Sequence, residues 1–89
     1  MTTVVATHAV GNMDTWLAGG VERAEIFKNF CSSYRIFKHV DQNQVSLVWE
    51  GVDLEKMQAM LGSPEAAEAK ERHTVIDPIE IYIDVDGGT

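Results

Sequence analysis

An alternating strand pattern that runs into a helix pattern, between residues 44 and 61, constrains the fold of this chain most. Apolar Val45, Leu47 and Trp49 are each separated by one residue, which is the period of a strand with one buried face. Asp53 can accept a hydrogen bond from the first turn of a helix, and apolar side chains then recur every three or four residues. We therefore expect a half-buried strand, followed by a helix whose apolar side is turned inward.

A second helical segment follows after a short break. Gly62 is suited to end a helix, and Ser63-Pro64 is a typical helix start, with a hydroxyl cap and a proline at the first helical position. The run from Ala66 to His73 is rich in alanine, so it can lie close against a sheet. Asp77-Pro78 predicts the end of this helical region, and a final strand is expected after it.

The rest of the chain predicts three further strands and one further helix. Asp41-Gln42-Asn43 predicts a hairpin turn, and Gly19-Gly20 predicts a bend, a break or a close approach of the helix to the sheet. The predicted strands are residues 2–10, 32–40 and 79–85. The predicted helix is residues 13–31, with an apolar stripe at Met13, Leu17, Gly20, Ala24, Phe27 and Cys31, widened by Trp16 and Phe30. Its predicted solvated side is marked by Glu22, Arg23, Glu25 and Lys28.

The order of these elements is β-α-β-β-α-β, which predicts a ferredoxin-like α+β fold in one domain over residues 1–89. Such a fold is a four-stranded antiparallel sheet with both helices on one face. The alternating Ile79, Ile81, Ile83 and Val85 are apolar enough to lie under the helices. The other face carries Tyr82 among charged residues, so we expect two copies to bury it as a homodimer, a dimeric α/β barrel.

Composition excludes several classes of partner. The formal net charge is −7, and the seven Lys and Arg residues are scattered, so we expect neither nucleic acid nor a membrane as a partner. The single cysteine, Cys31, excludes an internal disulfide and suits a reducing compartment. The chain shows neither a signal-peptide pattern nor a long apolar run, and we expect a cytoplasmic protein.

The run VSLVWEGVDLEKMQAML, the SPEAAEA segment, the short first strand and the Trp-bearing first helix resemble the dimeric α+β barrel superfamily. The likeness is to its antibiotic-biosynthesis-monooxygenase-like members and related small uncharacterised proteins, and it covers nearly the whole chain. Members include cofactor-independent oxygenases, heme-degrading enzymes, isomerases and decarboxylases. The resemblance therefore implies a fold, and leaves the chemistry to be argued from the site.

Heme-degrading members of that superfamily use an asparagine on the first strand, a tryptophan on the third and a histidine on the second helix. Trp49 and His73 stand at similar places in this sequence. The first strand offers Thr7 and His8 where the asparagine is expected, and the spacing from Ser63 to His73 differs. These departures disfavour heme cleavage.

Two histidines are the candidate catalytic residues, because an imidazole exchanges protons near neutral pH. His8 is either a general base in a pocket between sheet and helix or a packed side chain with one hydrogen bond. His73 ends a helix, where it either serves the site or interacts with the helix dipole. The candidate ligand-binding residues are Trp16, Trp49, Phe27 and Tyr82, and core or dimer packing is the alternative for these aromatic side chains.

Three functional classes remain open at this stage. The first is a cofactor-independent, monooxygenase-like enzyme that acts on a small aromatic or hydrophobic molecule. The second is a protein that binds such a ligand without chemistry, and the third is a dimeric assembly module. The sequence contains no nucleotide-binding or nucleophile motif, and its histidines are too dispersed to predict a metal site, so we expect no bound cofactor or metal.

Overall fold

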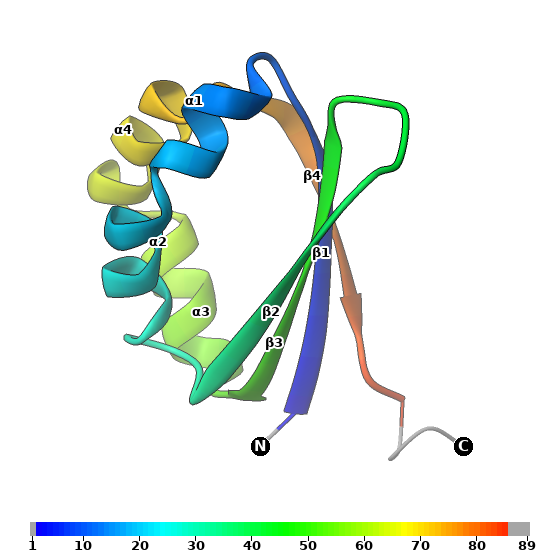
Figure 1. Ribbon diagram of the computed structural model, residues 1–89. Helices are drawn as coiled ribbons and strands as arrows, with labels where there is room; N and C mark the ends of the chain where they lie inside the picture. Colours follow the sequence, from blue (N-terminus) through cyan, green and yellow to red (C-terminus); the bar gives the residue numbers. More distant parts are fainter. Residues whose placement is uncertain (1, 86–89) are drawn as a thin grey trace.

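Helices cover one face of a four-stranded antiparallel sheet in the computed structural model, which describes residues 2–85 (Figure 1). The strands lie in the order β2-β3-β1-β4, so the first strand to appear in the chain is an inner strand of the sheet. The predicted ferredoxin-like order is confirmed, with each predicted helical region divided in two. The elements are β1 (Thr2–Val10), α1 (Met13–Ala18), α2 (Gly20–Phe27), β2 (Ser33–Lys38), β3 (Gln44–Val52), α3 (Leu54–Leu61), α4 (Pro64–Arg72) and β4 (Val75–Ile83).

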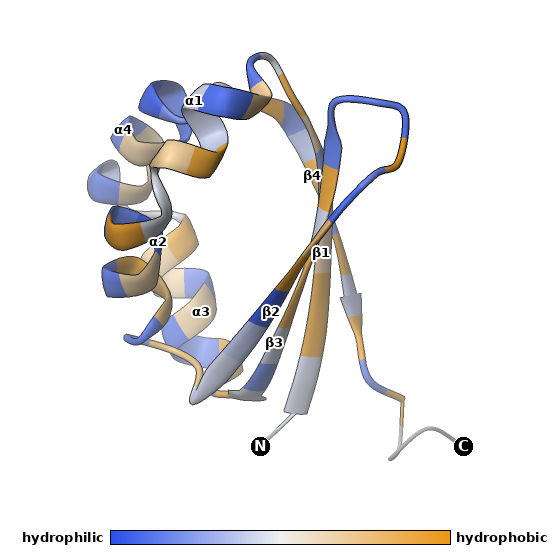
Figure 2. Ribbon diagram, in the orientation of Figure 1, coloured by the Kyte–Doolittle hydropathy of each residue, from blue (hydrophilic) through white to orange (hydrophobic). Residues whose placement is uncertain are grey.

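Strands β1 and β3 form the floor of the core. Every second residue of β1 is buried from Val4 to Val10, and the intervening residues are half-buried, as the alternation predicts. The register pairs Ala6 with Leu47 and His8 with Val45, so the buried rows of the two strands lie side by side. Figure 2 shows hydrophobic residues recurring along the strands, whereas the loop between β2 and β3 is largely hydrophilic.

The first helical region breaks at Gly19, where α1 ends and α2 begins. Asn12 caps α1 as predicted, since its side chain accepts a hydrogen bond from the Thr15 backbone N–H. Any Cβ at position 19 would overlap the imidazole of His73, so only glycine lets α4 end against this break. The predicted close approach is therefore real, but the neighbour is another helix rather than the sheet.

The predicted inner stripe of this region is correct in part. Met13, Trp16, Phe27 and Phe30 are buried as predicted. Leu17 is 51% exposed, whereas Arg23, predicted to be solvated, is only 5% exposed. The prediction for Arg23 was wrong because the guanidinium finds a hydrogen bond inside the protein, described below.

The second helical region follows the predicted caps. Asp53 accepts a hydrogen bond from the Lys56 backbone N–H at 3.2 Å, and Ser63 accepts one from Ala66 at the same distance. Gly62 ends α3 with a φ of −89°, so it terminates the helix without the left-handed conformation that helix-ending glycines often adopt. The alanines of α4 that face inward, Ala66 and Ala69, are buried.

Strand β4 begins earlier than predicted. It starts at Val75, so Asp77-Pro78 lies within it, where β1 and β4 change register between Thr7 and Ala9. Proline is tolerated there because β4 is an edge strand, with one side free of backbone pairing. The predicted isoleucine row does pair with the buried row of β1, although the helices leave Ile81 and Ile83 partly exposed. Val85 lies beyond the end of the strand.

No helix among residues 2–85 is long and apolar enough to cross a membrane.

The glycine pair offers a matched test of the contact between α4 and the helix break. Gly19→Ala should lower the free energy of unfolding by about 1–3 kcal/mol, because the added methyl group must displace the His73 ring. Gly20→Ala should be neutral or stabilising by up to roughly 1 kcal/mol, because open space surrounds that position and alanine favours the helix. Urea unfolding of both variants measures the difference, and equal stabilities would contradict the role given to Gly19.

Candidate functional site

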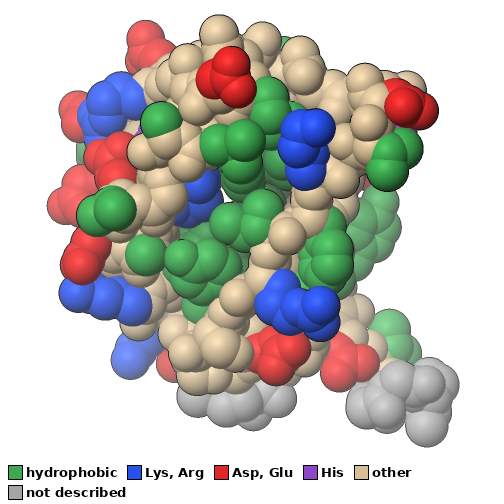
Figure 3. All heavy atoms as spheres, in the orientation of Figure 1, with side chains coloured by type: hydrophobic (Ala, Val, Ile, Leu, Met, Phe, Trp, Pro, Cys, Tyr) green, Lys and Arg blue, Asp and Glu red, His purple; other side chains and the backbone are tan. Residues whose placement is uncertain are grey.

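A partly open cavity of about 70 Å³ lies between the helices and the covered face of the sheet. Small side chains create it, because Ala6 on the sheet lies opposite Ala66 and Ala69 on α4, where larger residues would fill the space. Figure 3 shows a hollow in the molecular surface with hydrophobic side chains around it. The cavity is lined by Ala6, His8, Trp16, Arg23, Ile26, Phe27, Leu47, Trp49, Leu61, Ala66, Ala69, Lys70, His73, Val75 and Ile79.

His8 extends from the middle of β1 into this cavity. Its Nδ1 lies 2.9 Å from the backbone oxygen of Ala9. A carbonyl oxygen can only accept, so Nδ1 carries the hydrogen of the neutral ring and Nε2 holds the free lone pair. Burial lowers the pKa of His8 and outweighs the opposing effect of the Ala9 hydrogen bond, while the positive charges of Arg23 and Lys70 lower it further. His8 is therefore a neutral imidazole near pH 7, with Nε2 as a proton acceptor.

Trp16 and Arg23 form one wall as a stacked pair. The guanidinium carbon of Arg23 lies 3.7 Å from the centre of the Trp16 ring, and Nη2 donates a hydrogen bond to the Trp16 backbone oxygen. The same oxygen also accepts a hydrogen bond from the Gly19 backbone N–H at 3.1 Å, where α1 ends. The edge of the Trp16 ring also meets His8, with ring centres 6.1 Å apart.

Trp49 sits in an aromatic cluster at the other side of the cavity. Its ring centre lies 5.1 Å from that of Phe27 and 5.0 Å from that of Phe30, both edge-to-face. The indole Nε1 is buried and has no hydrogen-bond partner among residues 2–85. A buried N–H without an acceptor costs about 1–3 kcal/mol, so the packing of this ring in the core carries an energetic cost.

His73 closes the site at the end of α4. Its Nε2 lies 2.8 Å from Oε1 of Glu22, and Arg72 binds the other oxygen of the same carboxylate. The hydrogen bond from Arg72 is the main cause that lowers the pKa of Glu22, and the hydrogen bond with His73 acts in the same direction. This exposed network ties α4 to α2 and orients the imidazole at the cavity wall.

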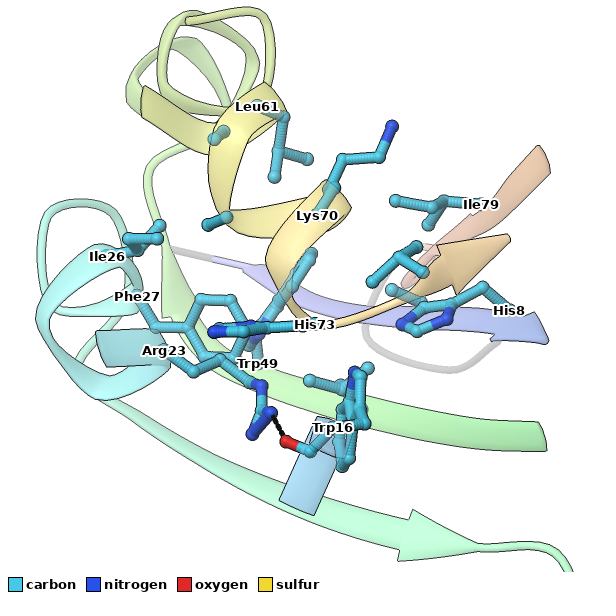
Figure 4. A pocket seen from close by; sticks show the side chains of 15 residues that line it. His8, Trp16, Arg23, Ile26, Phe27, Trp49, Leu61, Lys70, His73 and Ile79 are labelled. Atoms are coloured by element: carbon cyan, nitrogen blue, oxygen red, sulfur yellow. Dashed lines mark hydrogen bonds between the residues drawn. The ribbon is translucent and has the colours of Figure 1, made fainter. Parts of the chain in front are cut away.

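Figure 4 shows the side chains of His8, Trp16 and His73 in the cavity lining, from β1, α1 and the end of α4. Trp49 and Phe27 also line the cavity, so the structure brings together five of the six residues predicted from the sequence. Tyr82 is separated from them: it pairs with Val5 on the uncovered face of the sheet, is 54% exposed, and donates a hydrogen bond to Glu80 at 2.9 Å.

Sequence reasoning missed two charged residues of the cavity wall. The sequence predicts Arg23 on the solvated side, with binding of a carboxylate as the less favoured alternative, although its spacing of seven residues from Trp16 places both on one side of a helix. Lys70 lies at the cavity and pairs with Asp77 at 2.8 Å. Its position on an alanine-rich helix carried no signal of this kind.

Cys31 lies outside this arrangement. It is partly buried and donates a hydrogen bond to the Phe27 backbone oxygen, and burial raises the pKa of its thiol. Residues 2–85 contain no cluster of three or more His, Cys, Asp or Glu side chains that is suited to hold a metal ion.

No protein-family model matches the chain, and no curated protein matches it. Solved structures do match. A protein of Bordetella bronchiseptica with a provisional assignment as an antibiotic biosynthesis monooxygenase superposes with a TM-score of 0.73 at 14% identity, over 96% of this chain and 95% of that one. Protein Atu4242 of Agrobacterium tumefaciens gives 0.71 at 18% identity, over 96% and 92%. A mutant of SnoaB, a cofactor-independent oxygenase of Streptomyces nogalater, gives 0.68 at 15% identity, over 99% and 94%.

These structures share the ferredoxin-like fold of antibiotic-biosynthesis-monooxygenase-like proteins, which is the superfamily that the sequence resembles. At such low identities the likeness establishes the fold, and the activity has to be argued from the cavity.

His8 should take up a proton only below the ordinary histidine value of about 6.5, because burial lowers its pKa. The unfolded chain then binds this proton more readily than the folded protein. The contribution of His8 should therefore destabilise the protein as the pH falls through 6.5 and be absent well above it. NMR titration of the His8 ring gives the midpoint, and His8→Gln should remove this component of the pH dependence of urea unfolding. A midpoint at or above 6.5 would contradict the assignment.

Proposed function

We propose that this protein is a monooxygenase-like enzyme that acts, without a bound cofactor, on a small aromatic or hydrophobic molecule in the cavity. The observation that carries the proposal is the neutral imidazole of His8, held in one tautomer inside an apolar, aromatic-walled cavity. The fold shared with SnoaB, itself a cofactor-independent oxygenase, is consistent with it.

The chemistry needs a substrate that supplies its own electrons to oxygen. A methylene group activated by adjacent aromatic rings meets this need, because loss of a proton leaves an electron-rich anion. His8 Nε2 would accept that proton. In the balanced reaction the methylene carbon becomes a carbonyl with one atom of O₂, and the other oxygen atom leaves as water with both hydrogens. No external reductant enters.

The walls limit what can bind. A volume of about 70 Å³ exceeds what one water molecule needs, about 10–15 Å³, and is far below the roughly 300–1,000 Å³ of pockets that enclose a whole drug-sized ligand. The cavity therefore encloses one ring, and its open side leaves room for the rest of a larger molecule. Trp16, Phe27 and Trp49 supply flat apolar surfaces for it, and His73 provides a second imidazole at the wall.

A protein that binds such a ligand without chemistry is the second candidate. The aromatic walls favour it, since flat apolar surfaces serve binding as well as turnover. The two candidates differ in their response to the loss of His8. An enzyme loses turnover and keeps ligand affinity, whereas a pure binding protein shows no oxygen uptake in either form.

We also propose that the protein is a homodimer that buries the uncovered face of the sheet. Phe37 on β2 and Tyr82 on β4 are 45% and 54% exposed on this face, and Ile76 is exposed beside them. A second copy of the same face would remove these apolar side chains from water and complete a barrel.

Oxygen uptake tests the catalytic proposal. Anthrone is a suitable probe, because its methylene group lies between two aromatic rings. The protein should accelerate oxygen consumption, and His8→Gln should reduce the acceleration by a factor of about 10²–10⁴, as expected for loss of a general base. His39→Gln is the matched control, since His39 is exposed and binds only backbone N–H groups of its own turn. Equal losses in both variants, or no acceleration by the native protein, would rule the proposal out.

Light scattering tests the dimer. Tyr82→Glu should shift the species in solution from dimer to monomer, because it places an additional negative charge in the proposed contact. Val21→Glu is the control, since Val21 is 83% exposed on α2, away from the sheet. A native protein that is already monomeric, or a Tyr82 variant of unchanged mass, would exclude this interface.

A further inference from the structure

The cavity wall has the opposite charge to the rest of the chain. The protein carries fourteen Asp and Glu against seven Lys and Arg. Among the residues that line the cavity, however, every ionisable side chain is basic: His8, Arg23, Lys70 and His73. None of the lining residues is Asp or Glu. Acidic residues outnumber basic ones in the chain, yet no acidic side chain lines the cavity, and this favours a ligand with a negative charge.

Arg23 is the cation of this wall that lacks a carboxylate partner. Its neighbour Glu22 is bound by Arg72 and His73, and Lys70 is paired with Asp77. Within residues 2–85, Arg23 makes one hydrogen bond, to the Trp16 backbone oxygen, and no ion pair. The guanidinium has five N–H donors, so most of them remain available.

Burial makes this arrangement costly unless an anion completes it. Arg23 is 5% exposed, and a buried cation without a counter-charge is strongly disfavoured. Stacking on the Trp16 ring offsets part of that cost. The remaining N–H donors of Arg23 call for an acceptor, and a negatively charged oxygen serves them.

We infer that the cavity binds a small aromatic anion, either a carboxylate or an ionised phenol, whose oxygen is held by Arg23 while its ring lies against Trp16 and Phe27. This inference rests on the proposed function in one respect. The anion is taken to be the substrate itself, or the substrate after His8 has removed a proton from it. Arg23 is a binding residue in this arrangement. It also stabilises the negative charge that remains when a base removes the substrate proton.

Benzoate and benzamide form a matched pair of probes, because they differ in the charge of one substituent and are small enough for the cavity. The two tryptophans give two indole N–H signals in a ¹H–¹⁵N spectrum, and Trp49→Phe assigns them. Titration without oxygen should show that benzoate binds about tenfold more tightly than benzamide, or better, despite the net charge of −7. Equal affinity of the two probes in the native protein would exclude a carboxylate, and it would overturn the inference if the phenolate test described below is also negative.

Arg23→Met removes the charge and keeps a long apolar side chain, so it should reduce the preference for benzoate to about one. Arg23→Lys should retain part of it. Lys56→Met is the control, because Lys56 carries the same charge and lies exposed on α3, outside the cavity lining. Circular dichroism checks that each variant is folded. A preference that survives in the methionine variant would assign the anion to another group and overturn the role of Arg23.

A third probe separates the two kinds of anion. Para-nitrophenol absorbs visible light only when ionised, so an increase of its phenolate band on addition of protein at constant pH reports an ionised phenol in the cavity. Benzoate preference alone identifies an aromatic acid as the ligand class, and the phenolate band alone identifies a phenol. Binding is measured without turnover, so anion binding without oxygen uptake would reject only the enzymatic proposal. Oxygen uptake without anion preference would reject only this inference.

Discussion

Helices cover one face of the sheet only, so the interior forms between a single floor of strands and a single roof of helices. The floor is supplied by the alternating rows of β1 and β3, in which Val4, Ala6 and Leu47 are almost completely buried. The roof is uneven, with Phe27 of α2 and the following Phe30 on one side and alanines from α4 on the other. The aromatic half packs edge-to-face around Trp49, and the alanine half leaves the cavity open. The site is thus a result of how the covered face is filled.

Much of the fold could be predicted because its signals are local. Alternation along β1 and β3 and the capping residues Asp53 and Ser63 depend on a few neighbouring positions. The misassigned features depend on distant contacts. Arg23 is buried because it donates a hydrogen bond to the Trp16 backbone oxygen and stacks on the Trp16 ring. Helix periodicity does not predict either contact. The start of β4 was missed because an edge strand tolerates a proline that an inner strand would exclude.

The candidate site was predictable to the extent that its residues belong to inward-facing rows. His8 was found because it shares a row with Ala6, and Trp49 because it shares one with Leu47. Tyr82 belongs to the opposite row of β4, and a one-residue step along a strand changes the face. The size of the cavity was not predictable, since it depends on small side chains of β1 and α4, Ala6, Ala66 and Ala69, lying around the same space. The packing between elements determines this arrangement, and no single segment of the sequence encodes it.

The position of β1 inside the sheet has a consequence for how the protein is made. Its partners are Gln44 to Val52 on one side and Val75 to Ile83 on the other, so β1 emerges from the ribosome before either. Its pairing with β4 closes a loop that extends from Val4 to Ile83. Contacts of such sequence separation form late and slow the folding of small domains. Until β4 is synthesised, one edge of an apolar strand remains open, and the nascent chain must be protected from pairing with others during that interval.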